Sequence, residues 1–451
     1  MTSYWFQNSI IYHLFPLGLA GAPPANHTSE TVENNFGQIY PWIVHAKSLG
    51  ANVIFLGPVF ESSTHGYDTR DFYNIDRRLG NNSDFENFAS AVKQQGMQLV
   101  IDAVFNHVGR EFWAFRDVLE KGEQSAYTNW FENLHFGTTS PKGDPFGYEA
   151  WQGHYDLVKL NLANPDVRKH IFDAVRMWMD MFKIDGLRLD AADCIDFDFL
   201  RALRDFVKAR RSDFWLMGEV VHGDYRRWAN PATLDSVTNY ACYKGLYSSL
   251  NDGNYFEIAH TLNDQFGERG HYKDLYLYNF VDNHDVDRVA SKLHEERHLY
   301  PLYLLLYTLP GIPSIYYGSE WGIQGKKGEH TDAPLRPKLV IDDIKSPHPD
   351  LLGVISKLGE IRKGSTALRQ GDFKILFVNH QQLAFSRQTL EETMVVILNS
   401  SFENIDLNLA LPGQETAFID LINPGERFNA HDGQLQIPLQ PSWGRILKSV
   451  R

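Results

Sequence analysis

Short apolar runs alternate, over roughly the first 365 residues, with segments whose apolar residues recur every three or four positions. The runs predict buried β-strands, and the recurring stripes predict amphipathic α-helices. The strands are expected at residues 10–15, 52–56, 99–101, 186–190, 214–221, 236–242, 277–283 and 313–317. The pattern therefore predicts about eight strands with helical segments between them.

Local start and stop signals support this alternation. Pro41 suits the first turn of a helix that Gly50 ends, and the pair Ser83 and Glu86 has capping-box spacing. Pro165 opens the stripe that leads into residues 186–190. Strands that alternate with helices favour an α/β fold with a parallel sheet, and eight such strands favour a (β/α)₈ TIM barrel. A doubly wound open sheet is the alternative, because a strand count from sequence can be wrong by one or two.

Two segments depart from this rhythm. Residues 107–163 carry many aromatic side chains among polar residues and glycine, and a long irregular segment of this kind inside a domain is usually functional. We expect them to form an inserted domain after the third strand. From about residue 366 apolar residues alternate with polar ones, which predicts a C-terminal antiparallel β-sandwich over 366–451. Residues 1–106 and 164–365 then form the barrel.

Composition narrows the class of protein. Of 451 residues, 43% are hydrophobic and 22% are charged, as in an ordinary globular chain. A formal net charge of -13 and a pI near 5.7 argue against nucleic acid as a partner. The chain has only two cysteines, no leader in which an apolar region follows a basic one, and no apolar run long enough to cross a membrane. These features predict a cytoplasmic protein outside the membrane.

Three acidic residues stand at strand ends. Arg188 and Asp190 are two positions apart in one strand, so their side chains share a face, and the guanidinium is expected to lower the pKa of Asp190. A buried structural ion pair is the plain alternative. Glu219 and Asp285 end two further apolar segments. Because barrel enzymes place their chemistry at the carboxyl ends of the strands, the three carboxylates predict one shared site.

With these residues in place, the chain resembles the α-amylase family, glycoside hydrolase family 13. The matching motifs occur in the family's order at residues 102–107 (DAVFNH), 186–190 (GLRLD), 218–219 (GE) and 280–285 (FVDNHD). Residues 65–72 and 157–161 are similar to the cyclomaltodextrinase, maltogenic amylase and neopullulanase group. The resemblance spans the whole chain, including the insertion and the C-terminal domain.

The resemblance implies a retaining glycoside hydrolase that cleaves α-1,4-glucosidic bonds in cyclodextrins and malto-oligosaccharides, with maltose release and transglycosylation. Asp190 would be the nucleophile, Glu219 the acid and base, and Asp285 the transition-state stabiliser. An α-glucosidase or a 4-α-glucanotransferase is the first alternative, because loops such as the one after Tyr317 decide which sugar ends fit. The remote alternative is an inactive sugar-binding relative.

The same resemblance implies a set of sugar-binding residues: Tyr67, Asp68, His107, Arg188, His222, His284 and Arg336. Tyr67 is expected to stack on the sugar at the cleaved bond, against the plain alternative of a core aromatic residue. Asp68 is expected to pair with Arg336. Asp102 and Asn106 are interpreted as structural rather than contacting.

Some positions depart from family patterns. Lys159 stands where many α-amylases carry a calcium-binding aspartate, so no calcium and no other metal cofactor is expected there. Cys194 stands where the group often has a glutamate, and Val220 follows Glu219 where a tryptophan is common. The resemblance therefore does not decide the acceptor side of the site or the balance between hydrolysis and transfer. Because the group's N-terminal pairing domain has no counterpart before the strand at residue 10, we expect a monomer.

Overall fold

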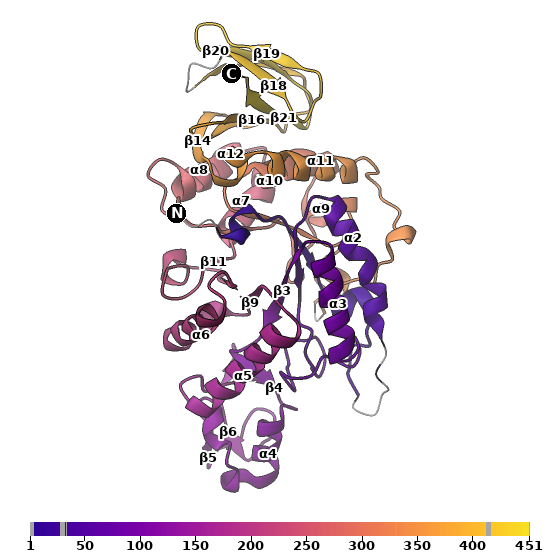
Figure 1. Ribbon diagram of the computed structural model, residues 1–451, viewed down its shortest axis with the longest axis vertical. Coiled ribbons are helices and arrows are strands. Elements are labelled where there is room, and N and C mark those ends of the chain that lie inside the picture. The colour runs from indigo at the N-terminus through magenta and orange to yellow at the C-terminus, as the bar shows by residue number, and fades with distance from the viewer. Residues whose placement is uncertain (1–3, 28–31, 33, 330, 412–415, 451) are drawn as a thin grey trace.

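The central sheet is a closed barrel of eight parallel strands (Figure 1). The computed structural model describes residues 4–27, 32, 34–329, 331–411 and 416–450. The strands, in sheet order, are β11 (Ser236–Val237), β10 (Trp215–Gly218), β9 (Gly186–Leu189), β3 (Gln98–Ala103), β2 (Val53–Leu56), β1 (Ile11–Leu14), β13 (Ile312–Tyr316) and β12 (Tyr278–Asn279). A parallel bridge between Thr238 and Tyr278 joins the two ends of this order. The predicted TIM barrel is confirmed, and the open sheet is wrong.

Helices surround the barrel because their apolar stripes pack against the outer faces of the strands. In α5, for example, Val167, Ile171, Val175 and Trp178 are all buried. The helices are α1 (Pro16–Ala20), α2 (Tyr40–Ser48), α3 (Asn82–Gln94), α5 (Pro165–Met181), α6 (Phe197–Arg210), α7 (Tyr240–Asn251), α8 (Tyr255–Phe266), α9 (Val289–Lys292), α10 (Leu299–Thr308) and α11 (Leu351–Gly364). Within the described ranges, none of the helices is both long enough and apolar enough to cross a membrane.

Two local predictions are wrong. The cap of α3 is Asn81, whose side chain accepts hydrogen bonds from the backbone N–H groups of Ser83 and Asp84, so the Ser83 and Glu86 box does not form. The strand expected over residues 236–242 ends at Val237. There the Asn239 side chain accepts from the Cys242 N–H and starts α7, which a run of apolar letters does not reveal.

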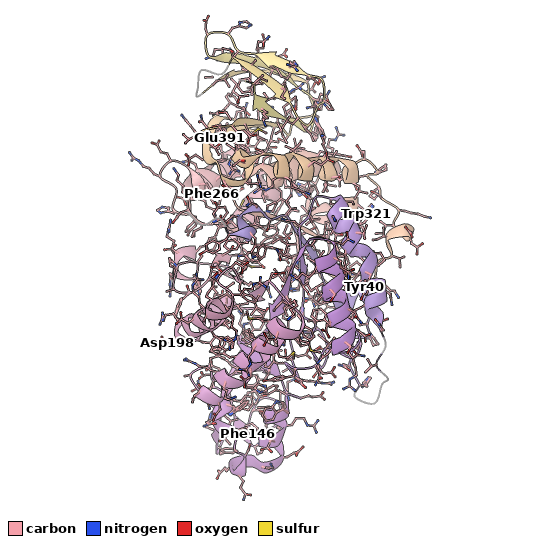
Figure 2. The ribbon with its side chains drawn as sticks, in the orientation of Figure 1. Tyr40, Phe146, Asp198, Phe266, Trp321 and Glu391 are labelled. Atoms are coloured by element: carbon pink, nitrogen blue, oxygen red, sulfur yellow. The ribbon has the colours of Figure 1, made fainter. Side chains whose placement is uncertain are left out.

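The segment 107–163 leaves the barrel through two antiparallel strands, β4 (His107–Gly109) and β8 (His154–Lys159), and β8 also pairs with β7 (Ala150–Trp151). Beyond this stem lie α4 (Trp113–Lys121), β5 (His135–Phe136) and β6 (Phe146–Gly147). Phe115 packs edge-on against Phe131 and Phe146, so the aromatic residues mostly form the segment's own core. Figure 2 places Phe146 near the end of the molecule opposite Glu391.

The C-terminal residues form an antiparallel β-sandwich, as predicted. After the short helix α12 (Thr366–Gln370), one sheet contains β14 (Asp372–Val378), β15 (Gln382–Gln388), β16 (Thr393–Asn399), β21 (Trp443–Ser449), β18 (Ala417–Asp420) and β19 (Arg427–Asn429). The other contains β17 (Ile405–Ala410) and β20 (Gln434–Leu439). Their facing apolar residues share one core. The sandwich lies at the end of the molecule farthest from β5 and β6 (Figure 1).

Candidate active site

Strand register brings the acidic residues together. Arg188 on β9 lies beside Asp102 on β3 and Met217 on β10. Leu189 and Gly218 are the last paired residues of β9 and β10, so the next residues, Asp190 and Glu219, leave neighbouring strands at the same edge. This edge is the carboxyl end of the parallel barrel, where enzymes of this fold carry their chemistry.

One guanidinium holds three carboxylates. Arg188 is buried and donates through Nη1 to Asp102 Oδ1 and Asp190 Oδ1, each at 2.8 Å. Its Nη2 lies 2.9 Å from Glu219 Oε1. A single cation balances only one negative charge in this buried place, so the cluster favours retention of protons on its acids. Arg188 thus lies beneath the carboxylates and orients them.

Burial dominates the pKa values of this cluster. It raises the pKa of Asp190 to about 7 and that of Asp102 to about 6, against the opposing effect of Arg188. Burial also raises the pKa of Glu219, with Asp190 and Asp285 adding to the shift. The expectation that Arg188 gives Asp190 a lowered pKa is therefore wrong, because desolvation and the neighbouring carboxylates outweigh the guanidinium. Because these acids share one cation, the protonation of each depends on that of the others, and all three have pKa values above the ordinary carboxyl range.

Asp285 is held by a guanidinium and an imidazole ring instead. Its Oδ2 lies 2.9 Å from His284 Nε2, and its Oδ1 accepts from Arg336 Nη2 at 2.9 Å. Burial alone would raise its pKa, but His284, Arg336 and Arg188 together lower the pKa below the ordinary carboxyl range. Asp285 therefore stays ionised where Asp190 and Glu219 hold protons more strongly.

The predicted sugar-binding residues mostly lie around these acids. The Tyr67 ring stacks on the His284 ring with centroids 5.5 Å apart, and its hydroxyl bonds to His284 Nε2 and, at 2.9 Å, to Asp102 Oδ2. Burial lowers the pKa of His107 to about 3, which keeps its ring neutral. Asp68 does not form the expected pair with Arg336. It accepts from Thr64 Oγ1 at 2.7 Å, whereas Arg336 pairs with Asp285 and Asp332.

A cavity of about 610 Å³, here called the central cavity, opens above the acids. That volume lies within the range of small-ligand sites. Of the predicted residues, Tyr67, His107, Asp190, Glu219, Asp285 and Arg336 line it. It also has lining residues that the sequence did not single out: Trp151, His154, Tyr240, Lys327 and Asp332. Tyr240 could have been found, because it closely follows a barrel strand, whereas the others stand on the short strands of the insertion or on loops, without a motif.

His222 and Val220 lie elsewhere. His222 is exposed and lines a neighbouring cavity instead of the central one. Val220 is buried, and its N–H donates to Thr238 Oγ1 at 2.9 Å. Val221, like Tyr240, lines both cavities. Substitution of a larger residue at 221 would therefore affect the space beside Glu219 directly.

Ala191 has a strained backbone next to Asp190. Its φ of 45° is in the left-handed region, which is uncommon for a residue with a Cβ. In this conformation its N–H donates to Glu219 Oε2 at 3.1 Å. Strain of this kind persists where the surrounding structure enforces it, and functional sites are common places for it. The residue after Asp190 thus fixes the orientation of the Glu219 carboxyl group.

Comparison with known proteins decides the family. The family model described as the α-amylase catalytic domain matches residues 42–357. The chain belongs to the α-amylase family. A cyclomaltodextrinase of Geobacillus thermopakistaniensis (strain MAS1) is 30% identical over 468 residues, which cover 99% of this chain and 77% of the relative. The intracellular maltogenic amylase of Bacillus subtilis (strain 168) is 29% identical over 415 residues, covering 88% and 69%.

A solved structure gives the same result. The cyclic alpha-maltosyl-(1-->6)-maltose hydrolase from Arthrobacter globiformis superposes with a TM-score of 0.82 at 26% identity, and the match covers 99% of this chain and 100% of that one. The predicted resemblance to the cyclomaltodextrinase and maltogenic amylase group is confirmed. This α-amylase-family chain is a glycosidase.

The position of Lys159 in this α-amylase-family chain is occupied by an ion pair. Lys159 Nζ donates to Glu149 Oε1 at 2.7 Å, and Asn133 donates to the other oxygen of Glu149. The negative charge of Glu149 is thus balanced by Lys159. Within the part of the chain that the structure describes, no group of three or more His, Cys, Asp or Glu side chains has a metal-binding arrangement.

Proposed function

We propose that this α-amylase-family enzyme hydrolyses α-1,4-glucosidic bonds in cyclodextrins and malto-oligosaccharides with retention of configuration, releases maltose and transfers glycosyl units to sugar acceptors. The observation that carries the proposal is the pair Asp190 and Glu219 on one guanidinium, at adjacent strand ends, with Asp285 on the same cavity. Two carboxylates held this close favour the shorter spacing of retaining enzymes, about 5–5.5 Å. The similarity to a cyclomaltodextrinase and a maltogenic amylase supports the substrate class.

The steps follow from the geometry. The ionised Asp190 attacks the anomeric carbon while Glu219 gives its proton to the leaving oxygen, which yields a covalent glycosyl-enzyme. Glu219, now ionised, takes a proton from water or a sugar hydroxyl, and the oxygen of that molecule displaces Asp190. Asp285 remains negative throughout and stabilises the positive charge that develops on the sugar ring. Tyr67, His107 and His284 are assigned to the sugar at the cleaved bond.

The direct test compares β-cyclodextrin, soluble starch and maltotriose as substrates, with proton NMR of the first product. Rapid cleavage of the cyclodextrin, slow attack on starch and an α-anomeric product are expected. Exclusive release of glucose would indicate the α-glucosidase instead, and redistribution of chain lengths without new reducing ends would indicate the glucanotransferase. A β-anomeric first product would contradict the double displacement.

The pH dependence of activity should show that the pKa values of Asp190 and Glu219 are both raised. Activity requires an ionised Asp190, so it falls as pH decreases through the lower apparent pKa, and a protonated Glu219, so it falls as pH rises through the upper one. Because burial raises the pKa of Asp190 to about 7 and also raises that of Glu219, the acidic limb of kcat/KM should lie well above the ordinary carboxyl value of about 4. A profile of kcat/KM for maltotriose from pH 4 to pH 9 measures this. Full activity at pH 4 would contradict the assignment.

A chelator should leave the enzyme unchanged. At the position where other α-amylases carry an aspartate, a lysine ammonium is paired with Glu149, and a cation disfavours binding of a second cation. Incubation with an excess of EDTA, followed by dialysis, is expected to change neither Tm nor kcat/KM. A decrease in Tm that added calcium reverses would show that a structural calcium site exists.

The cellular setting follows the same proposal. Cys194 and Cys242 are both free thiols, and one relative is an intracellular maltogenic amylase, which supports a reduced, cytoplasmic compartment.

We propose that the protein is a monomer. Sedimentation at micromolar concentration should give a mass near 51.8 kDa, and a mass twice as large would show a dimer.

A further inference from the structure

The carboxyl end of β1 lies beside the groups that hold Asp285. Phe15 directly follows this strand, and its side chain is buried. Its backbone is still extended, so its ring leaves the chain on the same side as the ring of His13. His13 packs edge-on against His284, with ring centroids 5.1 Å apart. This side of β1 therefore supports the part of the site that contains Asp285.

The Phe15 ring contacts both partners of Asp285. The His284 ring stacks on it, with centroids 5.5 Å apart and an angle of 21° between the planes. The Arg336 guanidinium lies over the same ring, with its central carbon 4.4 Å from the ring centroid. His284 and Arg336 are also the side chains that meet the two oxygens of Asp285, at 2.9 Å each. One aromatic ring thus braces both groups that hold this carboxylate.

Arg336 is almost fully enclosed, with 9% of its side chain exposed. Its Nε donates to the backbone carbonyl of His284 at 3.0 Å, and its Nη2 donates to Asp285 and Asp332 at 2.9 and 3.0 Å. The N–H groups of a guanidinium lie in its plane, so these bonds leave its faces free to pack on a ring. The attraction of a cation to an aromatic face is electrostatic and is stronger where water is excluded.

Two glycines provide the space for this arrangement. A Cβ at Gly57, just after β2, would lie 3.0 Å from Cδ2 of Phe15. A Cβ at Gly18, on α1, would overlap the carbonyl oxygen of Arg336. Glycine is the usual residue where another part of the chain approaches this closely. The sequence therefore leaves room for both members of the contact between the ring and the guanidinium.

Resting on the proposed function, we propose that Phe15 is a positioning residue for Asp285. Its ring holds Arg336 through a cation–π contact and His284 through stacking, so the carboxylate stays where positive charge develops on the sugar ring. Phe15 is not among the described residues that line the central cavity, and it acts through these two side chains. A ring that only filled the core would contribute by its shape, whereas a cation–π contact depends on the electron density of the ring face.

The experiment changes that electron density and leaves the shape of the ring almost unchanged. Phe15 is replaced by 4-fluoro-, 3,5-difluoro- and 3,4,5-trifluorophenylalanine, because fluorine withdraws electron density and weakens the attraction for a cation. We expect kcat on maltotriose to fall in that order, by about fivefold for the trifluoro ring, while KM stays within twofold. A loss in kcat at constant KM indicates an interaction that acts in the transition state.

Phe85 is the matched control. It is fully buried on α3, and its ring packs against the rings of Phe36, Phe88 and Phe182. The trifluoro ring at this position should leave kcat unchanged. Circular dichroism and Tm check the fold of every variant, and the 4-fluoro ring at Phe15, which replaces a single hydrogen, gives a result that does not depend on the larger rings.

A second control removes the cation. In an Arg336→Ala background, which is expected to be less active, the trifluoro ring at Phe15 should change kcat by less than twofold, because the guanidinium that it weakens is gone. The difference between the two backgrounds measures the coupling of the ring to Arg336.

The outcomes separate the two proposals. If the wild type does not cleave maltotriose, the proposed function fails. If the wild type cleaves it, but the fluorinated rings at Phe15 leave kcat unchanged or lower it equally in the Arg336→Ala background, the assignment of Phe15 is overturned and the proposed function stands.

Discussion

Replacement of Asp190 by asparagine is expected to lower kcat/KM on maltotriose by about 10⁴-fold or more, because the neutral amide cannot act as the nucleophile that forms the glycosyl-enzyme. Asp198→Asn is the control, since Asp198 lies in the first turn of α6 and points outward from the barrel (Figure 2). Activity of Asp190→Asn within tenfold of the wild type would rule out the nucleophile assignment.

The same variant has a second readout in stability. Burial gives Asp190 a pKa of about 7 in the folded protein, above the value of about 4 in an unfolded chain. The folded state therefore retains this proton to a higher pH, and the free energy of unfolding falls as pH rises between these values. Asparagine removes that penalty, so Tm of the variant relative to the wild type should be higher at pH 7.5 than at pH 4. A reversed order would contradict the raised pKa.

Glu219→Gln should have an effect that depends on the leaving group. On maltotriose, kcat/KM is expected to fall by about 10²–10⁴-fold, because glutamine cannot donate a proton to the departing oxygen. On α-maltosyl fluoride the loss in the first, glycosyl-enzyme-forming step should be much smaller, since fluoride departs without protonation. Rapid-mixing measurements of fluoride release isolate that step.

Glu360→Gln on α11 serves as the matched exposed control for this change and should leave both rates unchanged. Equal losses on maltotriose and on the fluoride in the Glu219 variant would indicate that Glu219 acts only in binding. Preserved activity on maltotriose would exclude it as the acid.

The barrel could be predicted from the sequence because its signals are local and repeated. Pro165 at the start of α5 and the apolar stripe that follows specify one strand–helix unit without any distant contact. The prediction of a strand over residues 236–242 was wrong because one apolar run extended from the end of a strand into the next helix. Val237 ends β11, but a side-chain cap from Asn239 turns the chain into α7 within three residues.

The candidate site could be predicted only as far as its motifs extend. Asp190 and Glu219 follow from strand ends, and their neighbourhood follows from parallel register. The pKa of Asp190 depends on how many carboxylates share Arg188 and on how little water reaches them, and neither quantity is written in the local sequence. Trp151 on the short strand β7 and Lys327 on a loop line the central cavity through tertiary packing, so no spacing rule identifies them.

The β4–β8 stem makes the inserted segment an exchangeable unit. His107 at the start of β4 pairs with Lys159 at the end of β8, so both ends of the insertion are fastened at the barrel rim. Part of its aromatic core, such as Phe115 against Phe131, packs within the insertion itself. Trp151 and His154, near the far end of the stem, line the central cavity. Grafting residues 110–158 from a relative would therefore replace one wall of the sugar site and leave the bond-breaking acids untouched. Evolution could have altered substrate preference in this family by that kind of cassette exchange.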